Sequence, residues 1–219
     1  EQSQNRRTTL YEDHTALEAR MGEFGGWDMP IQYSGILSEV DAVRKHCGIF
    51  DVSHMGRIYI TGVDAPLLLN MLVTSPVLSM KTMQARYGLM CNGNGGIIDD
   101  MIYYKLREDQ FLLIPNAGNR EAVLQWITAT NNKYFNSAID VQDDTLKTDM
   151  LAVQGPNSKF LITQLFPRST MSEIFPGIEH GVGVREMISN LKFFEAVDVH
   201  ISLSDIAHGD LTIARTGYT

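Results

Sequence analysis

The spacing of apolar residues predicts helices interleaved with strands along most of the chain. In helices, apolar positions recur every three or four residues and line one face. Leu10, Leu17 and Met21 follow this spacing in the first predicted helix. Asp64 precedes another, where its carboxylate is expected to cap the first free amides. The predicted helices cover residues 8–23, 38–46, 64–72 and 120–128. We expect the second to end at Gly48 in a left-handed cap.

Alternating apolar and polar residues predict strands between these helices. The glycine-rich stretch 92–96 separates two such runs and favours a hairpin. A run rich in glycine and serine, residues 167–190, predicts a connection rather than a regular element. The predicted strands cover residues 49–60, 86–91, 97–106, 110–115, 150–154, 192–201 and 210–214.

A weak internal repeat relates the two halves of the chain. Residues 62–72 resemble residues 155–165, and each stretch follows a predicted strand and opens a helix. Convergent capping chemistry at strand–helix joints is the alternative explanation. Two such units predict an α+β fold of ferredoxin-like strand–helix–strand repeats with antiparallel or mixed sheets. The predicted segments are 1–50, an N-terminal helical segment packing on the core, 51–140, a first α+β half, and 141–219, a second half.

Composition narrows the class of protein. The 219 residues are 44% hydrophobic and 20% charged, which is typical of a globular protein with a core. The formal charge of −8 argues against a nucleic-acid partner. No apolar run approaches the roughly 20 residues that cross a bilayer, so no membrane partner is expected.

The ends and cysteines suggest a compartment. Residues 1–7 show no apolar signal core, which argues against secretion. The two cysteines, Cys47 and Cys91, predict no disulfide framework and favour a reducing compartment, the cytoplasm or, in a eukaryote, the mitochondrial matrix. Cys47 and His46 have no second ligand pair nearby in sequence, so no metal is expected.

Adjacent carboxylates interrupt the strand that follows the glycine turn. In a strand of period two, Asp99 and Asp100 point to opposite faces, so one of them faces the core unless a bulge intervenes. A buried carboxylate loses several kcal/mol of hydration without a donor or cation, which makes it a candidate acid or base. Alternatively, the inward carboxylate caps the glycine turn, an explanation that suits Asp99 better.

Other polar residues give weaker signals. Ser53 and His54 lack the Gly-x-Ser-x-Gly elbow of a hydrolase, so a hydrogen-bonded histidine that closes a turn is the favoured interpretation. The glycines at 93, 95 and 96 lack a following helix and a Gly-Lys-Ser/Thr, which argues against a phosphate loop. Asn116 is either a hydrogen-bonding amide for a ligand or a turn residue.

Several motifs, in order and over nearly the whole chain, resemble the aminomethyltransferase family, the T-protein of the glycine cleavage system. The matching stretches are 24–30 (FGGWDMP), 42–44 (AVR), 50–56 (FDVSHMG), 94–100 (NGGIIDD), 115–119 (PNAGN), 154–156 (QGP) and 215–219 (RTGYT). In that family the last aspartate of the fourth motif is catalytic. The resemblance therefore selects Asp100 and implies that it faces inward towards a cavity, while Asp99 points away.

The resemblance also implies a reaction, a cofactor and a partner. The family transfers a one-carbon unit from the aminomethyl-lipoyl arm of the H-protein to tetrahydrofolate and releases ammonia. By position in the matched motifs, a folate cavity would be lined by Met55, Tyr87, Ile102, Tyr104, Asn116 and Tyr218. Aromatic and thioether walls with an amide suit a flat heterocycle. Taken singly, Tyr87, Ile102 and Tyr104 could also be ordinary strand core.

The chain departs from the family pattern at its C-terminal side. Family members continue beyond Arg215–Thr219 through a Gly-Glu-Asp-Gly segment, whose glutamate is expected to bind the pterin, and supply a later arginine. A C-terminally truncated member would expose apolar surface, which a second copy of the chain could cover. The alternatives to the enzyme are an inactive folate-binding or assembly module and another folate-dependent one-carbon transferase.

Overall fold

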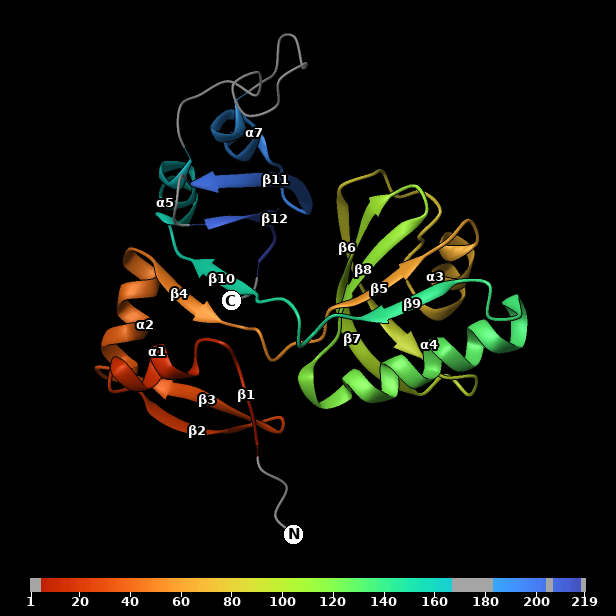
Figure 1. The fold of residues 1–219 in the computed structure, drawn as a ribbon, viewed down its shortest axis with the longest axis horizontal. Helices are drawn as coiled ribbons and strands as arrows, with labels where there is room; N and C mark the ends of the chain where they lie inside the picture. Colours follow the sequence, from red (N-terminus) through yellow and green to blue (C-terminus); the bar gives the residue numbers. More distant parts are fainter. Residues whose placement is uncertain (1–4, 167–182, 204–206, 218–219) are drawn as a thin grey trace. The chain divides into compact units, whose positions relative to one another are not determined.

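The structure is a computed structural model that describes residues 5–166, 183–203 and 207–217 (Figure 1). The chain divides into two compact units, Glu1–Asp41 with Ile49–Ala152, and Ala42–Gly48 with Val153–Thr219. These limits differ from the predicted boundaries at residues 50 and 140, and the predicted three-segment division stays a prediction.

The first unit begins with a small mixed sheet. Strand β1 (Arg6–Arg7) pairs parallel with β3 (Trp27–Gln32), and β2 (Arg20–Phe24) pairs antiparallel with β3. Between β1 and β2 lies α1 (Tyr11–Ala16), so the helix predicted over 8–23 is shorter than expected. Glu18 adopts a positive φ of 57°, a left-handed conformation that cannot continue a helix, and the chain then turns into β2.

The larger sheet of this unit is antiparallel throughout. Its neighbours run in the order β6-β7-β8-β5-β9. The hairpin predicted around the glycine-rich turn is confirmed as β6 and β7, since Gln84 pairs with Lys105 at the far end of the pair. The strands are β5 (Ile58–Thr61), β6 (Gln84–Cys91), β7 (Ile97–Arg107), β8 (Gln110–Ile114) and β9 (Asp140–Asp143).

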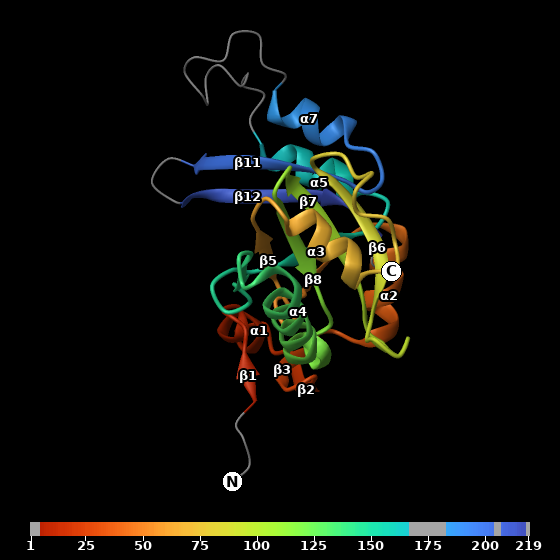
Figure 2. The ribbon, with the colours of Figure 1, turned by 90° about the vertical axis from the view of Figure 1, so that its right-hand side faces the viewer.

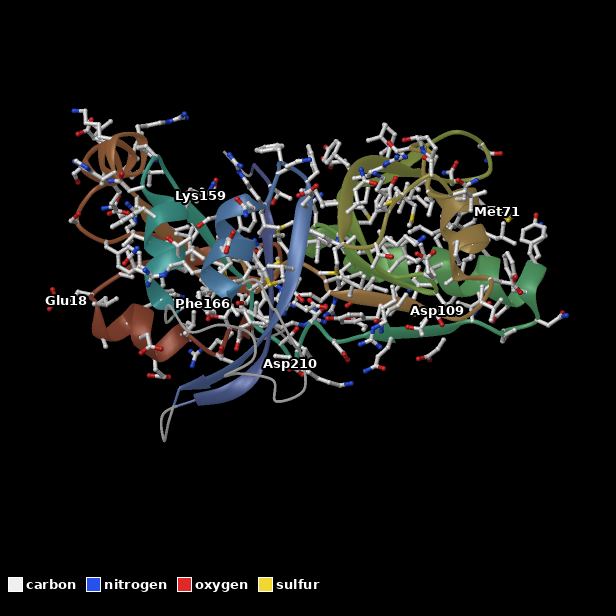
Figure 3. The ribbon with its side chains drawn as sticks, turned by 90° about the horizontal axis from the view of Figure 1, so that it is seen from above. Glu18, Met71, Asp109, Lys159, Phe166 and Asp210 are labelled. Carbon is white, nitrogen blue, oxygen red and sulfur yellow. The ribbon has the colours of Figure 1, made fainter. Side chains whose placement is uncertain are left out.

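Helices α3 (Ala65–Leu72) and α4 (Arg120–Phe135) cover one face of the larger sheet, as Figure 2 shows. Odd-numbered residues of β7 point towards these helices, so Met101 and Tyr103 are buried. On the outer side of α3, Met71 is exposed (Figure 3). The centre of this core consists of fully buried side chains: Ile58, Ile60, Leu68, Leu69, Met90, Tyr103, Phe111, Leu113, Val123 and Ile127. The centre of this core therefore lies on the face of the sheet that α3 and α4 cover.

The second unit contains α5 (Ser158–Leu165), α7 (Val184–Asn190) and an antiparallel hairpin of β11 (Glu195–Leu203) and β12 (Ala207–Arg215). Its core includes Phe166, Val184, Ile188, Leu191, Val197 and Val199. Helix α2 (Ile36–Lys45), β4 (Gly48–Asp51) and β10 (Leu151–Gln154) each contain a limit between the units. Gly48 is the first residue of β4, so the predicted left-handed helix cap there is wrong.

The weak repeat corresponds to a repeated local geometry. Gly62 after β5 and Gly155 after β10 both have positive φ, at 146° and 119°. Each glycine carbonyl accepts from the amide three residues later, Ala65 and Ser158 respectively, at the start of the following helix. The side chain of Asp64 makes no capping hydrogen bond, so the predicted cap is wrong and the turn geometry itself begins the helix.

The α+β class with antiparallel and mixed sheets is thus confirmed. In the part of the chain that the structure describes, no helix has both the length and the apolar character that crossing a membrane requires.

Candidate functional site

The Asp99 carboxylate is buried at the end of the larger sheet, with 2% of the residue exposed. Its Oδ2 accepts from the main-chain amide of Asn116 at 2.8 Å. Its Oδ1 accepts from the side-chain amides of Asn116 and Asn119 at 2.9 and 2.7 Å. These donors replace the water that Asp99 loses on burial. Asp99 is therefore an anchor for the loop that contains Asn116 and the short 3₁₀ turn η1 (Ala117–Asn119).

The sequence after β8 supplies these donors. Strand β8 ends at Ile114, and Pro115 has no amide hydrogen with which to extend the ladder. The next amide, that of Asn116, is thus free to donate to Asp99. The predicted alternative, in which Asp99 caps the glycine turn, is wrong. That turn is held by Asn92, whose Oδ1 accepts from the amides of Asn94 and Gly96.

Asp100 lies on the opposite face of β7 and is exposed. The phenol of Tyr87 donates to its Oδ2, and the side-chain amide of Asn116 donates to its Oδ1 at 3.2 Å. The same amide group donates to the Asp100 carbonyl at 2.9 Å. Asn116 therefore joins both carboxylates, and the Asp100 carboxylate is oriented by donors from β6 and from the 115–119 loop.

The prediction that Asp100 faces inward and Asp99 points away is wrong. Alternation places the two carboxylates on opposite faces, as expected, but α3 and α4 cover the face that carries Asp99. Consecutive residues Met90 and Cys91 pair with Asp99 and Ile97, so a register shift lies at Ile98. This shift does not bring both carboxylates to one face.

Three predicted folate-binding residues share the face of Asp100. Tyr87 pairs with Ile102 across β6 and β7, and directly opposed residues project to the same side of a sheet. Tyr104 lies two residues further along β7 and therefore also on this side. Tyr87 is 50% exposed, Ile102 is half-buried and Tyr104 is buried. We call Tyr87, Asp100, Ile102 and Tyr104 the Asp100 face.

The loop between β4 and β5, which contains Met55, is tied to the 115–119 loop. The amide of Gly56 donates to the Pro115 carbonyl at 2.8 Å, which ties residue 56 to the residue before Asn116. A Cβ on Gly56 would lie 2.5 Å from Pro115 Cγ, so this approach needs a glycine. Met55, directly before Gly56, is half-buried.

The two-residue turn between β2 and β3 meets the same loops. Phe24 pairs with Trp27 across Gly25 and Gly26, which both have positive φ, as a tight hairpin requires. A Cβ on Gly25 would lie 3.3 Å from that of Ala117, and the Phe24 ring packs edge-on against His54. Motifs 24–30, 50–56, 94–100 and 115–119 thus converge around the two aspartates.

Buried polar groups hold the 50–56 loop through Asp51. His14 Nε2 lies 2.9 Å from Asp51 Oδ2, and the phenol of Tyr33 lies 2.9 Å from His14 Nδ1. Burial acts to raise the pKa of Asp51, but hydrogen bonds, among them those with His14 and from the Ser53 amide, outweigh it and leave the pKa below its ordinary value. Asp51 is therefore an ionised anchor for the loop.

His54 differs from its predicted role. Burial lowers the pKa of His54, so the imidazole is favoured in its neutral form. Within the described residues its Nδ1 is buried without a hydrogen-bond partner, so this atom does not close a turn as predicted.

The sequence interpretation missed Asn119, Asp51 and Arg57 as supports of the site. The first two lie within matched motifs, which was an available signal.

Tyr218 lies outside the described residues. Among the residues described, no group of three His, Cys, Asp or Glu side chains could hold a metal ion, and both cysteines are free.

Gly56→Ala is expected to lower the free energy of unfolding by about 1–3 kcal/mol, because the added methyl forces Pro115 or Arg120 aside. Urea denaturation measures this change. Gly93→Ala is the control, since nothing lies within 4 Å of a Cβ there. Equal stability of the two variants would contradict the close approach.

The Tyr87 phenol is expected to ionise above its ordinary pKa near 10, because its hydrogen bond to Asp100 favours the protonated form. The bond persists below this raised pKa and is lost as pH rises through it. A difference titration at 295 nm against Tyr87→Phe isolates this phenol. Asp100→Asn should move the pKa back towards 10; an unchanged value would refute the coupling.

Comparisons with known proteins identify relatives of this chain. The family model described as GCVT N-terminal domain matches residues 10–182. An aminomethyltransferase of Corynebacterium jeikeium (strain K411) is 36% identical over 215 residues, which cover 98% of this chain and 52% of that protein. The crystal structure of glycine cleavage system aminomethyltransferase T from Bartonella henselae superposes with a TM-score of 0.75 at 29% identity, covering 98% of this chain and 51% of that one.

The chain spans about half the length of these relatives. The family model covers most of the chain and includes the motifs that converge at Asp99 and Asp100. The resemblance to aminomethyltransferases is thereby confirmed, and the chain belongs to the family of the GCVT N-terminal domain.

Proposed function

We propose that this chain binds tetrahydrofolate on the Asp100 face and supplies the carboxylate of an aminomethyltransferase reaction. The observation that carries the proposal is the Asp100 carboxylate, exposed yet oriented by Tyr87 and Asn116. A carboxylate has about four lone-pair positions, and within the described part of the chain these donors occupy two of them, which leaves others for a ligand.

The residues around Asp100 suit a reduced pterin. Tyr87 offers a half-exposed aromatic ring, and Ile102 offers an apolar surface on the same face. Such walls favour stacking on a flat heterocycle, while a carboxylate favours its N–H groups. We propose that Met55, Tyr104, Asn116 and Tyr218 complete this site.

The proposed reaction needs a group that manages protons on nitrogen. The methylene carbon of the S–CH₂–NH₂ arm exchanges its C–S and C–N bonds for two bonds to folate nitrogens. The two N–H protons of tetrahydrofolate end on the lipoyl sulfur and on ammonia. Asp100 would orient the attacking nitrogen, stabilise its developing positive charge and accept its proton.

The partner in this proposal is a lipoyl-carrying H-protein, and the compartment is a reducing one, cytoplasm or mitochondrial matrix. A homo-oligomer stays a prediction.

The test is calorimetric titration of the chain with tetrahydrofolate, followed by assay of methylenetetrahydrofolate and ammonia with aminomethylated lipoyl carrier. Saturable binding with formation of both products is expected. Binding without turnover would make the chain a folate-binding module and refute its proposed activity. Absence of binding would refute the proposed site.

A further inference from the structure

Arg57 is a buried cation between the Met55 loop and the segment after β9. The residue is 3% exposed, and burial lowers its pKa while Asp149 and Asp143 oppose this shift. A guanidinium nevertheless stays protonated in proteins, so a full positive charge lies in the interior. Removing such a charge from water costs several kcal/mol unless its donors are satisfied.

Each of the five N–H donors of this guanidinium has an acceptor. Nη1 donates to the carbonyls of Ser53 and Met55 at 2.8 and 2.5 Å. Nη2 donates to the carbonyls of Thr145 and Thr148, and Nε donates to the Thr148 hydroxyl at 3.0 Å. The planar fork therefore holds two separate segments in one arrangement, which a lysine with three donors and a single nitrogen cannot reproduce.

The main chain of Arg57 reinforces this link. Its amide donates to the Thr145 hydroxyl at 3.0 Å, and its carbonyl accepts from the Asp144 amide at 2.9 Å. The side chain and backbone of one residue thus fasten the loop before β5 to the segment after β9.

Met55 is consequently held from both sides. Its carbonyl accepts from Arg57, and the next residue, Gly56, donates to Pro115 at a distance that excludes a side chain. Pro115 precedes Asn116, which donates to Asp100. The guanidinium therefore fixes the position of the Met55 main chain relative to Asn116. Its own acceptors belong to Ser53, Met55, Thr145 and Thr148, and none of these residues is part of the Asp100 face.

We propose that Arg57 is a positioning residue that places Met55 as one wall of the tetrahydrofolate site beside Asn116. This inference rests on the proposed function, because it assigns Arg57 a role in the affinity of that site. A merely structural role would change stability but not the affinity of the folded protein.

Arg57→Lys is expected to raise the Kd for tetrahydrofolate, measured by calorimetry on the folded chain, about tenfold. KM for tetrahydrofolate should rise in parallel while kcat changes less than about threefold, since Asp100 keeps its own donors. The matched control is Arg86→Lys. Arg86 donates to the Pro76 carbonyl, and it lies on the sheet face opposite Tyr87, so the Kd should stay within about twofold.

Thr148→Val provides a second variant, because it removes the acceptor of Nε and leaves the other guanidinium bonds. We expect a smaller rise in Kd, about threefold. If Arg57→Lys does not fold, the Kd of Thr148→Val tests the proposal instead, and a Kd equal to that of the wild-type chain would overturn it. A folded Arg57→Lys protein with wild-type Kd would also overturn it and leave the proposed function intact. Failure of the wild-type chain to bind tetrahydrofolate would instead refute the proposed function itself.

Discussion

Asp99→Ala is expected to lower the free energy of unfolding by about 3 kcal/mol, because it leaves buried donors without an acceptor. The lost acceptor serves the Asn116 amide and the side-chain amides of Asn116 and Asn119. Hydrogen bonds to an ionised acceptor contribute more than neutral ones, and an unpaired buried donor keeps its full desolvation cost. Urea denaturation followed by circular dichroism measures the change.

Asp99→Asn refines this prediction. The substitution keeps the volume of the side chain but replaces one oxygen with a donor, so at least one of the facing N–H groups meets another N–H. We expect a loss of about 2 kcal/mol. Asp109→Ala is the control, since Asp109 is exposed in the turn after β7 (Figure 3). Wild-type stability for Asp99→Ala would show that Asp99 does not anchor the 115–119 loop.

Asp100→Asn is expected to have the opposite profile. We expect kcat for methylenetetrahydrofolate formation to fall about 100-fold or more, because an amide cannot accept a proton from the folate nitrogen. The free energy of unfolding should change by no more than about 0.5 kcal/mol, because Asp100 is exposed and its partners can bond to water.

A second aspartate on an exposed part of the chain provides the control for charge. Asp109→Asn, at the other end of β7, should leave kcat unchanged and controls for the loss of one negative charge. Steady-state assay with aminomethylated lipoyl carrier gives kcat for each variant. Unchanged kcat in Asp100→Asn would remove the proposed chemistry, whereas a stability loss matching that of Asp99→Asn would show that the two carboxylates act as one structural unit through Asn116.

Asp99 and Asp100 have different roles, which explains why one strand carries two adjacent carboxylates. The buried one holds the 115–119 loop, and the exposed one is oriented by that same loop and by Tyr87. The side-chain amide of Asn116 contacts both, so it contributes to the stability of one group and to the orientation of the other. Residues that contribute to the same network are expected to show non-additive effects when both are replaced.

The local pattern of residues determined several of the helices and strands. The β6–β7 hairpin follows from alternation on both sides of a glycine-rich turn, and α2 and α4 follow from their apolar spacing. The helix expected over 8–23 ends at Ala16, because the left-handed conformation of Glu18 cannot continue it. The ordered motifs also determined the family, since their order does not depend on how the chain packs.

Only the tertiary structure decided which aspartate is buried and what supports the site. Period two assigns Asp99 and Asp100 to opposite faces but treats the faces as equivalent; α3 and α4 make one of them the core. The donors to Asp99 come from 17 and 20 residues later, and acceptors of Arg57 come from 88 and 91 residues later. Hydrogen bonds between such distant segments form because the folded sheet brings the segments together, and no local pattern of hydrophobic and polar residues specifies them.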